Sequence, residues 1–222
     1  MGKHYKGADN RGQALVSQSQ SKNPAVPKPI SAHNPLILAS GSKYRAELLS
    51  RLHLPFVGMA PELDESTLAG ETGRQLAQRL AFAKAQTLSE RFPERWVIGS
   101  DQAAECDGRI LGKPGTRERA IEQLGFLSGK SVEFLTAVAL VSGSKHFTAL
   151  DITTVQFRTL TNVEIEHYVE IEPAFDCTGS FKCEGYGISL FESIRSDDPT
   201  GLIGLPLIAV RRLLAQAGLL LR

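Results

Sequence analysis

The stretch LILASGSKYRAELLSRLH, residues 36–53, joins a short apolar run to a helical pattern through a Gly-Ser turn. Its first part, LILAS at 36–40, is the continuous apolar run that is typical of a strand buried on both faces. Gly41 and Ser42 interrupt that run, and from 44 to 53 apolar residues recur at helical spacing. The stretch therefore predicts a strand, a tight turn and a helix, which is the repeating unit of an α/β fold.

The same alternation continues in both directions along the chain. It predicts strands at 56–60 and 96–105, and helices at 72–92 and 117–127. Toward the C-terminus, strands at 131–141 and 146–157 flank Ser-Gly-Ser-Lys and should form a hairpin. A helix at 162–172, a strand at 186–191 and a helix at 205–217 follow. Early strand–helix alternation with a late hairpin predicts an α/β fold with a mixed sheet.

The composition is that of a soluble globular protein, with 42% hydrophobic and 22% charged residues among 222. A formal net charge of +1 gives no global field that favours nucleic acid or a membrane surface. The three cysteines form no C-x-x-C pair and give no disulfide framework. No apolar run approaches the roughly 20 residues of a membrane span. We therefore expect a cytoplasmic protein without nucleic-acid or membrane partners.

Residues 1–33 differ in composition and hydrophobic pattern from the rest of the chain. They are rich in Gln, Ser, Lys and Pro and lack apolar periodicity, so they have little to contribute to a core. We predict a disordered leader or extension at 1–33 and one folded domain at 34–222.

The first turn carries a candidate phosphate site. A Gly/Ser turn at a helix start exposes backbone N–H groups and the positive end of the helix dipole. Ser40 and Ser42 add hydroxyl groups, and Arg45 adds a forked cation. A plain N-cap serine followed by surface charge accounts for the same residues, so the turn alone does not decide between the two interpretations.

Carboxylates appear at two further places. Asp101, followed by Gln102, ends the buried strand, a frequent catalytic position in α/β folds; a turn-capping aspartate is the alternative. Glu62 belongs to the acidic stretch PELDE at 61–65, whose oxygens suit Mg²⁺ or Mn²⁺; a solvated acidic turn is the alternative. No histidine pair at metal-ligand spacing and no G-x-S-x-G motif competes with these candidates.

Three more residues are candidates for ligand contact. Lys84 stands in an apolar helical segment, and Lys113 in the rigid turn LGKP at 111–114. Each lysine either reaches a phosphate or extends to water. Glu184 lies in the glycine-containing stretch FKCEGYG at 181–187, which is otherwise an ordinary acidic loop.

The order of these weak signals is more specific than any one of them. LASGSKYRAELL, APELDE, the helix around Lys84, IGSDQ, LGKP, YVEIEPAFDCTGSFKCEGYG and GLIGLPL together resemble the Maf family of nucleotide pyrophosphatases. The resemblance runs from about Leu36 to Leu214. It implies an elongated, two-lobed α/β fold with a mixed sheet flanked by helices, similar to inosine-triphosphate pyrophosphatases. It also implies a site in the cleft between the lobes, and a homodimer.

The resemblance also implies a function. A nucleoside triphosphate would be cut to a monophosphate and pyrophosphate, with Mg²⁺ or Mn²⁺ held partly by Glu62 and Asp101. Asp101 matches the family's proton acceptor, and its phosphate-binding positions match Ser40, Arg45, Lys84 and Lys113. Tyr44, Gln102 and Glu184 match the positions that separate substrate branches, and they are similar to the branch acting on 7-methyl-GTP. The alternatives are a dTTP/UTP or deaminated-purine pyrophosphatase, a nucleotide-binding regulator of cell division, and a scaffold with solvated charged loops.

Overall fold

The computed structural model describes Met1 and residues 27–219, so the disorder predicted for residues 2–26 lies outside the described part. The described chain forms one seven-stranded sheet. Its strands are β1 (Leu36–Leu38), β2 (Phe56–Gly58), β3 (Val97–Cys106), β4 (Arg109–Leu111), β5 (Ser131–Ser142), β6 (Lys145–Phe157) and β7 (Phe191–Arg195). The helices are α1 (Lys43–Ser50), α2 (Gly73–Arg91), α3 (Arg117–Leu127), α4 (Asn162–Ile171), the 3₁₀ helix η1 (Tyr186–Leu190) and α5 (Leu207–Gln216).

The sheet has the order β2-β1-β3-β5-β6-β7, with β4 paired to β3. β1 runs parallel to β2 and β3, whereas the β3–β5, β5–β6, β6–β7 and β3–β4 pairs are antiparallel. This confirms the predicted mixed sheet. The predicted hairpin is confirmed as well, since β5 and β6 pair along their length across the turn at Gly143.

One edge of β3 is interrupted in the middle. β1 pairs with Val97 and Ile98, and β4 pairs with residues 104–106, so residues 99–103 have a strand neighbour only on the β5 side. Asp101 and Gln102 lie in this gap, in the middle of β3 and not at the end of the strand where they were predicted. The topology therefore leaves the edge of a buried strand accessible at the residues that carry the predicted chemistry.

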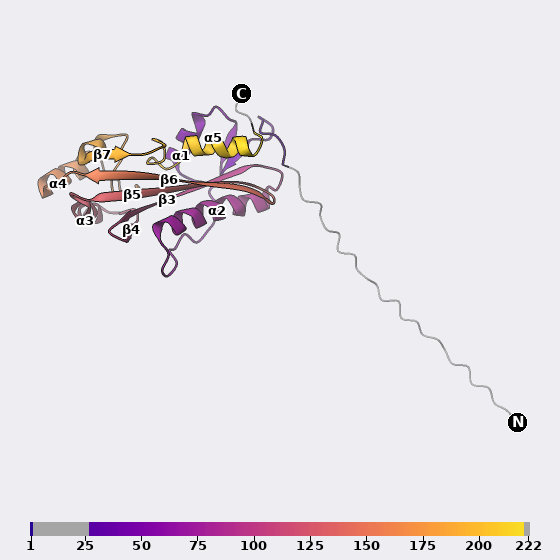
Figure 1. The fold of residues 1–222 in the computed structure, drawn as a ribbon, viewed down its shortest axis with the longest axis horizontal. Coiled ribbons are helices and arrows are strands. Elements are labelled where there is room, and N and C mark those ends of the chain that lie inside the picture. Colours follow the sequence, from indigo (N-terminus) through magenta and orange to yellow (C-terminus); the bar gives the residue numbers. More distant parts are fainter. Residues whose placement is uncertain (2–26, 220–222) are drawn as a thin grey trace.

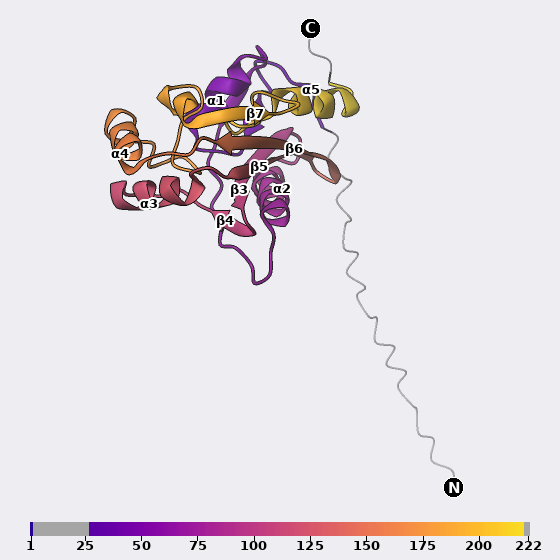
Figure 2. The same cartoon turned by 60° about the vertical axis from the view of Figure 1, so that its left-hand side comes forward.

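Period-two alternation distributes the core between the two faces of the sheet. Leu36, Leu38 and Ile98 pack with α1 and α5 on one face, whereas Ile37 and Val97 pack with α2 on the other. At the far end of the long strands, α3 and α4 cover a separate aromatic cluster (Figures 1 and 2). The body is elongated, with one apolar cluster near each end and β3, β5 and β6 running through both (Figure 1).

Small residues let α2 approach β3 closely. A Cβ atom at Gly99 would overlap the Ala81 carbonyl oxygen and lie 2.7 Å from the Ala85 nitrogen. The close approach has a consequence for chemistry, because it brings the middle of α2, with Lys84, onto the part of β3 that carries Asp101.

The structure differs from the prediction at two places. The strand expected at 186–191 is wrong: residues 186–190 form η1, and β7 begins only at Phe191. The reason is local crowding, because Gly187 lies against the Lys182 backbone and donates its N–H to the Glu172 carboxylate (3.0 Å). The three-residue strand β4 was not predicted, because so short a segment carries no periodicity.

The described end of the leader contacts the body. The Lys28 N–H donates to the Glu94 carbonyl (3.0 Å), and Ile30 packs against the cluster formed with α1 and α5. These contacts extend the body to a few residues before the predicted boundary at 34. Among the described residues, no helix combines the length and apolar character that a membrane crossing requires.

Candidate active site

A cavity of about 440 Å³ opens at the gap in the β3 edge. Its volume is in the range of small-molecule sites. Sequence positions far apart in the chain meet in its wall. Among the predicted site residues, the wall contains Ser42, Tyr44, Arg45, Lys84, Asp101, Gln102, Lys113 and Glu184. Ser40 and Glu62 are not in the wall.

Asp101 and Lys84 form a buried ion pair at the centre of this wall. The Lys84 Nζ atom is 2.6 Å from Asp101 Oδ1, and the two residues are 5% and 7% exposed. Burial raises the pKa of the Asp101 carboxyl above its usual range, and the nearby charges of Lys84 and Arg45 oppose that rise. Lys84 also contacts Glu65, whose Oε1 atom is 2.9 Å from Nζ. We refer to Arg45, Glu65, Lys84 and Asp101 as the Asp101 cluster.

Arg45 is held from two sides before any ligand binds. Its Nε donates to the Gly204 carbonyl at 2.8 Å, and its Nη1 lies 3.5 Å from the Ser40 hydroxyl oxygen. Ser42 caps α1 by accepting a hydrogen bond from the Arg45 N–H (3.4 Å). The turn thus acts as a helix cap and as a support for Arg45, and Ser40 contributes as a support for it rather than as part of the cavity wall.

The orientation of the Gln102 amide follows from its partners. Its Nε2 atom donates to the Gly201 and Leu202 carbonyl oxygens at 3.1 and 3.0 Å and contacts the Thr136 hydroxyl at 3.0 Å. Two backbone carbonyls accept only, so they fix the NH₂ group on their side. The side chain therefore offers its carbonyl oxygen, an acceptor, to a ligand in the cavity.

A second group of side chains in the wall surrounds Tyr44. Lys182 Nζ lies 6.0 Å from the centre of the Tyr44 ring, and the Cys183 thiol donates to Glu184 Oε2 at 3.4 Å. Burial raises the pKa of Cys183 to about 12, so the thiol remains a donor. We refer to Tyr44, Asp176, Cys177, Lys182, Cys183 and Glu184 as the Tyr44 cluster. The cluster has two carboxylates and one ammonium group, and Lys43, outside the wall, brings a second ammonium group to 5.1 Å from the centre of the Tyr44 ring.

The acidic stretch reaches the cavity through a different residue from the predicted one. Glu62 is exposed and lies outside the wall, whereas Glu65 and Thr67 line it. Among the described residues no group of three or more His, Cys, Asp or Glu side chains is arranged to hold a metal ion. Asp101 and Glu65, both in contact with Lys84, nevertheless fit Mg²⁺ or Mn²⁺, because such ions are commonly bound by one or two carboxylates together with substrate phosphates.

Sequence reasoning missed the loop that supports several of these side chains. Carbonyl groups at 201–204 accept from Arg45, Ser100, Gln102 and Thr136. Asp198, 3% exposed, holds the loop by accepting from Thr200 and from the first turn of α5. The motif GLIGLPL was the available signal, but backbone carbonyls leave no trace in residue type.

Comparison with known proteins places the chain in a family. Residues 35–217 match the family model described as Maf-like protein. A protein of Xanthomonas axonopodis pv. citri named 7-methyl-GTP pyrophosphatase is 60% identical over 183 residues, covering 82% of this chain and 96% of its own. Proteins of the same name from Polaromonas sp. and Pseudomonas aeruginosa are each 52% identical, covering 84% and 82% of this chain and 86% and 96% of their own.

A comparison of structures gives a more distant match. The Staphylococcus aureus Ham1 protein superposes with a TM-score of 0.42 at 15% identity, over 56% of this chain and 72% of that one. The match of the family model over most of the chain and the high identity to these relatives lead to one conclusion: the chain belongs to the Maf-like protein family.

Proposed function

We propose that this chain hydrolyses 7-methyl-GTP to 7-methyl-GMP and pyrophosphate. The observation that carries the proposal is the meeting of the Asp101 cluster and the Tyr44 cluster in one cavity. The first offers a buried carboxylate among cations, and the second offers an aromatic face together with two carboxylates. Relatives at 52–60% identity carry the name of this activity.

The proposed chemistry assigns tasks to Asp101 and to the three cations of the cavity wall that lie in the predicted phosphate-binding positions. Asp101 accepts a proton from a water molecule that attacks the α-phosphorus. The bond from that phosphorus to the bridging oxygen breaks, and pyrophosphate leaves with this oxygen. Arg45, Lys84 and Lys113 stabilise the charge that develops on the departing group. Burial supports the role of Asp101, because a raised pKa makes the carboxylate a stronger base.

We propose Mg²⁺ or Mn²⁺ as the cofactor, held by Asp101 and Glu65 together with the substrate phosphates. When bound, such an ion neutralises triphosphate charge and lowers the pKa of water. The contact of Glu65 with Lys84 favours Glu65 over Glu62 as the second carboxylate.

The Tyr44 cluster supports a methylated guanine as the base. Methylation at N7 gives the purine a delocalised positive charge, which gains a cation–π contact of about 0.5–2 kcal/mol over an aromatic face. The Asp176 and Glu184 carboxylates in the same wall attract such a base, against the opposing charges of Lys182 and Lys43. The Gln102 carbonyl oxygen and the Glu184 carboxylate are acceptors suited to the N–H groups of guanine.

Pyrophosphate release from a nucleotide panel tests the proposal. The specificity constant kcat/KM should fall in the order 7-methyl-GTP, GTP, then UTP or dTTP, and chelation of divalent metal should abolish turnover. Faster release from UTP or dTTP than from 7-methyl-GTP would contradict the assignment of 7-methyl-GTP as the substrate. It would not contradict the assignment of a pyrophosphatase activity. Tight nucleotide binding without release from any member of the panel would indicate a regulator instead of an enzyme.

Glu184→Gln tests the charge of the base site. Loss of the carboxylate charge removes a Coulomb attraction of about 1 kcal/mol that only the cationic methylated base gains, so the preference for 7-methyl-GTP over GTP should narrow about fivefold. Tyr44→Arg should weaken the methylated substrate further, because it sets a cation against a cationic base. The matched control is Glu192→Gln on β7, which is exposed and outside the cavity wall. An unchanged preference in Glu184→Gln contradicts the assignment.

A further inference from the structure

The loop at 59–72, between β2 and α2, carries Glu65 and Thr67 into the cavity wall. Apolar burial holds it weakly: residues 64–70 are all exposed, and Leu63 is only partly buried against the Ala77–Leu80 part of α2. Glu65 nevertheless keeps its Oε1 atom 2.9 Å from Lys84. An exposed loop retains such a geometry only if polar contacts hold it.

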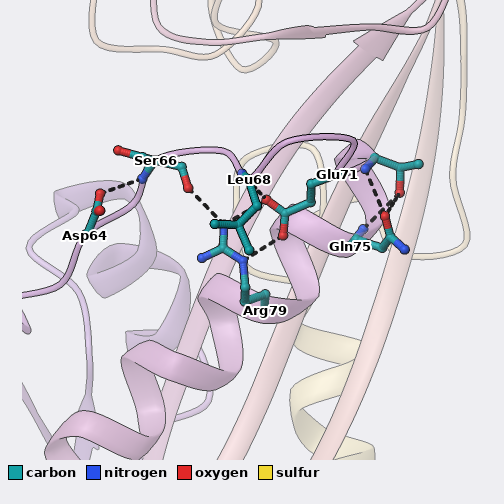
Figure 3. Close-up of polar contacts among 7 residues, drawn as sticks. Asp64, Ser66, Leu68, Glu71, Gln75 and Arg79 are labelled. Atoms are coloured by element: carbon teal, nitrogen blue, oxygen red, sulfur yellow. Dashed lines mark hydrogen bonds and ion pairs between the residues drawn. The ribbon is translucent and has the colours of Figure 1, made fainter.

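Those contacts converge on Arg79 of α2 (Figure 3). Its Nε and Nη2 atoms donate to the two carboxylate oxygens of Glu71 at 2.6 and 2.8 Å, and Nη2 also donates to the Ser66 carbonyl at 3.0 Å. Glu71 Oε2 accepts in addition from the Leu68 N–H at 3.0 Å. One guanidinium group therefore ties two points of the loop to the helix with the fixed geometry of a forked pair, and Glu71 ties in a third point, the Leu68 N–H.

We refer to the contacts of Arg79 with Glu71 and Ser66 as the clamp. The clamp and the cavity wall share helix α2. Arg79 holds the carbonyl of Ser66, the residue directly after Glu65, and Lys84, five positions further along α2, contacts the Glu65 carboxylate. The hydrogen bond from Arg79 lowers the pKa of Glu71 to about 2. Glu71 therefore remains ionised, and the clamp intact, throughout the neutral and moderately acidic range.

We propose that Arg79 is a positioning residue, which acts through Glu71 and Ser66 to keep Glu65 beside Lys84 and Asp101. Arg79 does not line the cavity, and its effect passes entirely through Glu65. The activity readout of the proposal rests on the proposed function. The structural readout, the mobility of the loop, does not.

Hydrogen–deuterium exchange and a double-mutant cycle on the full chain test this role together. Arg79→Met should speed amide exchange at 62–70 and lower kcat/KM for the best nucleotide about 10- to 100-fold, the usual cost of losing a group that orients a ligand-binding carboxylate. In a Glu65→Gln background the same change should cost no more than about twofold, because the group that it positions is already disabled. Arg74→Met, on the same helix at an exposed residue with no ion pair among the described residues, should stay within about twofold of the unmodified protein.

Full additivity of the two changes overturns the proposal, since a general loss of folding would act equally in both backgrounds. Unchanged exchange at 62–70 in Arg79→Met overturns it too, whatever the activity shows. Absence of turnover in the unmodified protein would contradict the proposed function. The exchange measurement would still test whether Arg79 holds the loop at 62–70. Arg79→Lys, which keeps the charge without the fork, should recover only part of the loop protection.

Discussion

Replacement of Asp101 by asparagine is expected to lower kcat by about 10²- to 10⁴-fold, the usual contribution of a general base. The amide keeps the shape of the carboxylate but cannot accept the proton of the attacking water. The affinity for nucleotide should change far less, because Arg45 and Lys113 remain in the wall. Single-turnover kinetics and calorimetric titration with nucleotide separate the two effects. Turnover near that of the unmodified protein would remove Asp101 from its assigned role.

The pH profile provides a second check on the same residue. Asp101 acts as a base only when ionised, so kcat/KM should fall as pH decreases through the pKa of its carboxyl. In the metal-free protein burial raises that pKa above the value of about 3.9 for an exposed aspartate, which NMR titration of the carboxyl without metal measures, whereas a bound divalent cation would lower it. Lys84→Met should shift that pKa further upward, because the lysine charge opposes the rise. A carboxyl that titrates at or below the ordinary aspartate value in the metal-free protein contradicts the buried environment assigned to Asp101.

Replacement of Gly99 by alanine is expected to destabilise the fold by about 1–3 kcal/mol or more, in the range of overpacked cores. The added Cβ atom meets the Ala81 carbonyl and the Ala85 nitrogen, which belong to a helix backbone and cannot rotate away. Since α2 must move, the Lys84–Asp101 contact should loosen and turnover should fall together with stability. Urea unfolding and the melting temperature measure the first effect, and kcat the second.

Gly125→Ala is the matched control for Gly99→Ala. Gly125 lies in α3, with no atom within 4 Å of an added Cβ. Alanine there should be neutral or stabilise by up to about 1 kcal/mol, since it favours the helix. A Gly99→Ala protein that melts at the temperature of this control would show that α2 and β3 tolerate a wider separation than the structure indicates.

Much of the fold was predictable because its signals are local. The apolar run at 36–40, the turn at Gly143 and the helix at 117–127 each follow from residues within one element. The segment 186–191 was mispredicted because its conformation depends on the Glu172 carboxylate and the Lys182 backbone, which no pattern within the segment reveals.

The candidate site was predictable in its residue types and less so in its geometry. Lys84 and Asp101 come together because α2 lies on β3, an arrangement that strand–helix alternation makes natural. The acidic stretch offered several carboxylates, and the sequence could not decide that Glu65 faces the cavity. That choice depends on the contacts of Arg79 and Glu71 with the loop. The Gln102 amide orientation likewise depends on carbonyl groups about a hundred positions away.

The long strands that run through both ends of the body have a consequence for how the protein unfolds. β3, β5 and β6 contain 10, 12 and 13 residues and are paired along their length. The two apolar clusters are therefore joined by continuous backbone ladders instead of a flexible linker. Unfolding of either cluster would remove hydrogen-bonding partners from strands that also carry the other cluster. We therefore expect the two ends to unfold in a single cooperative transition.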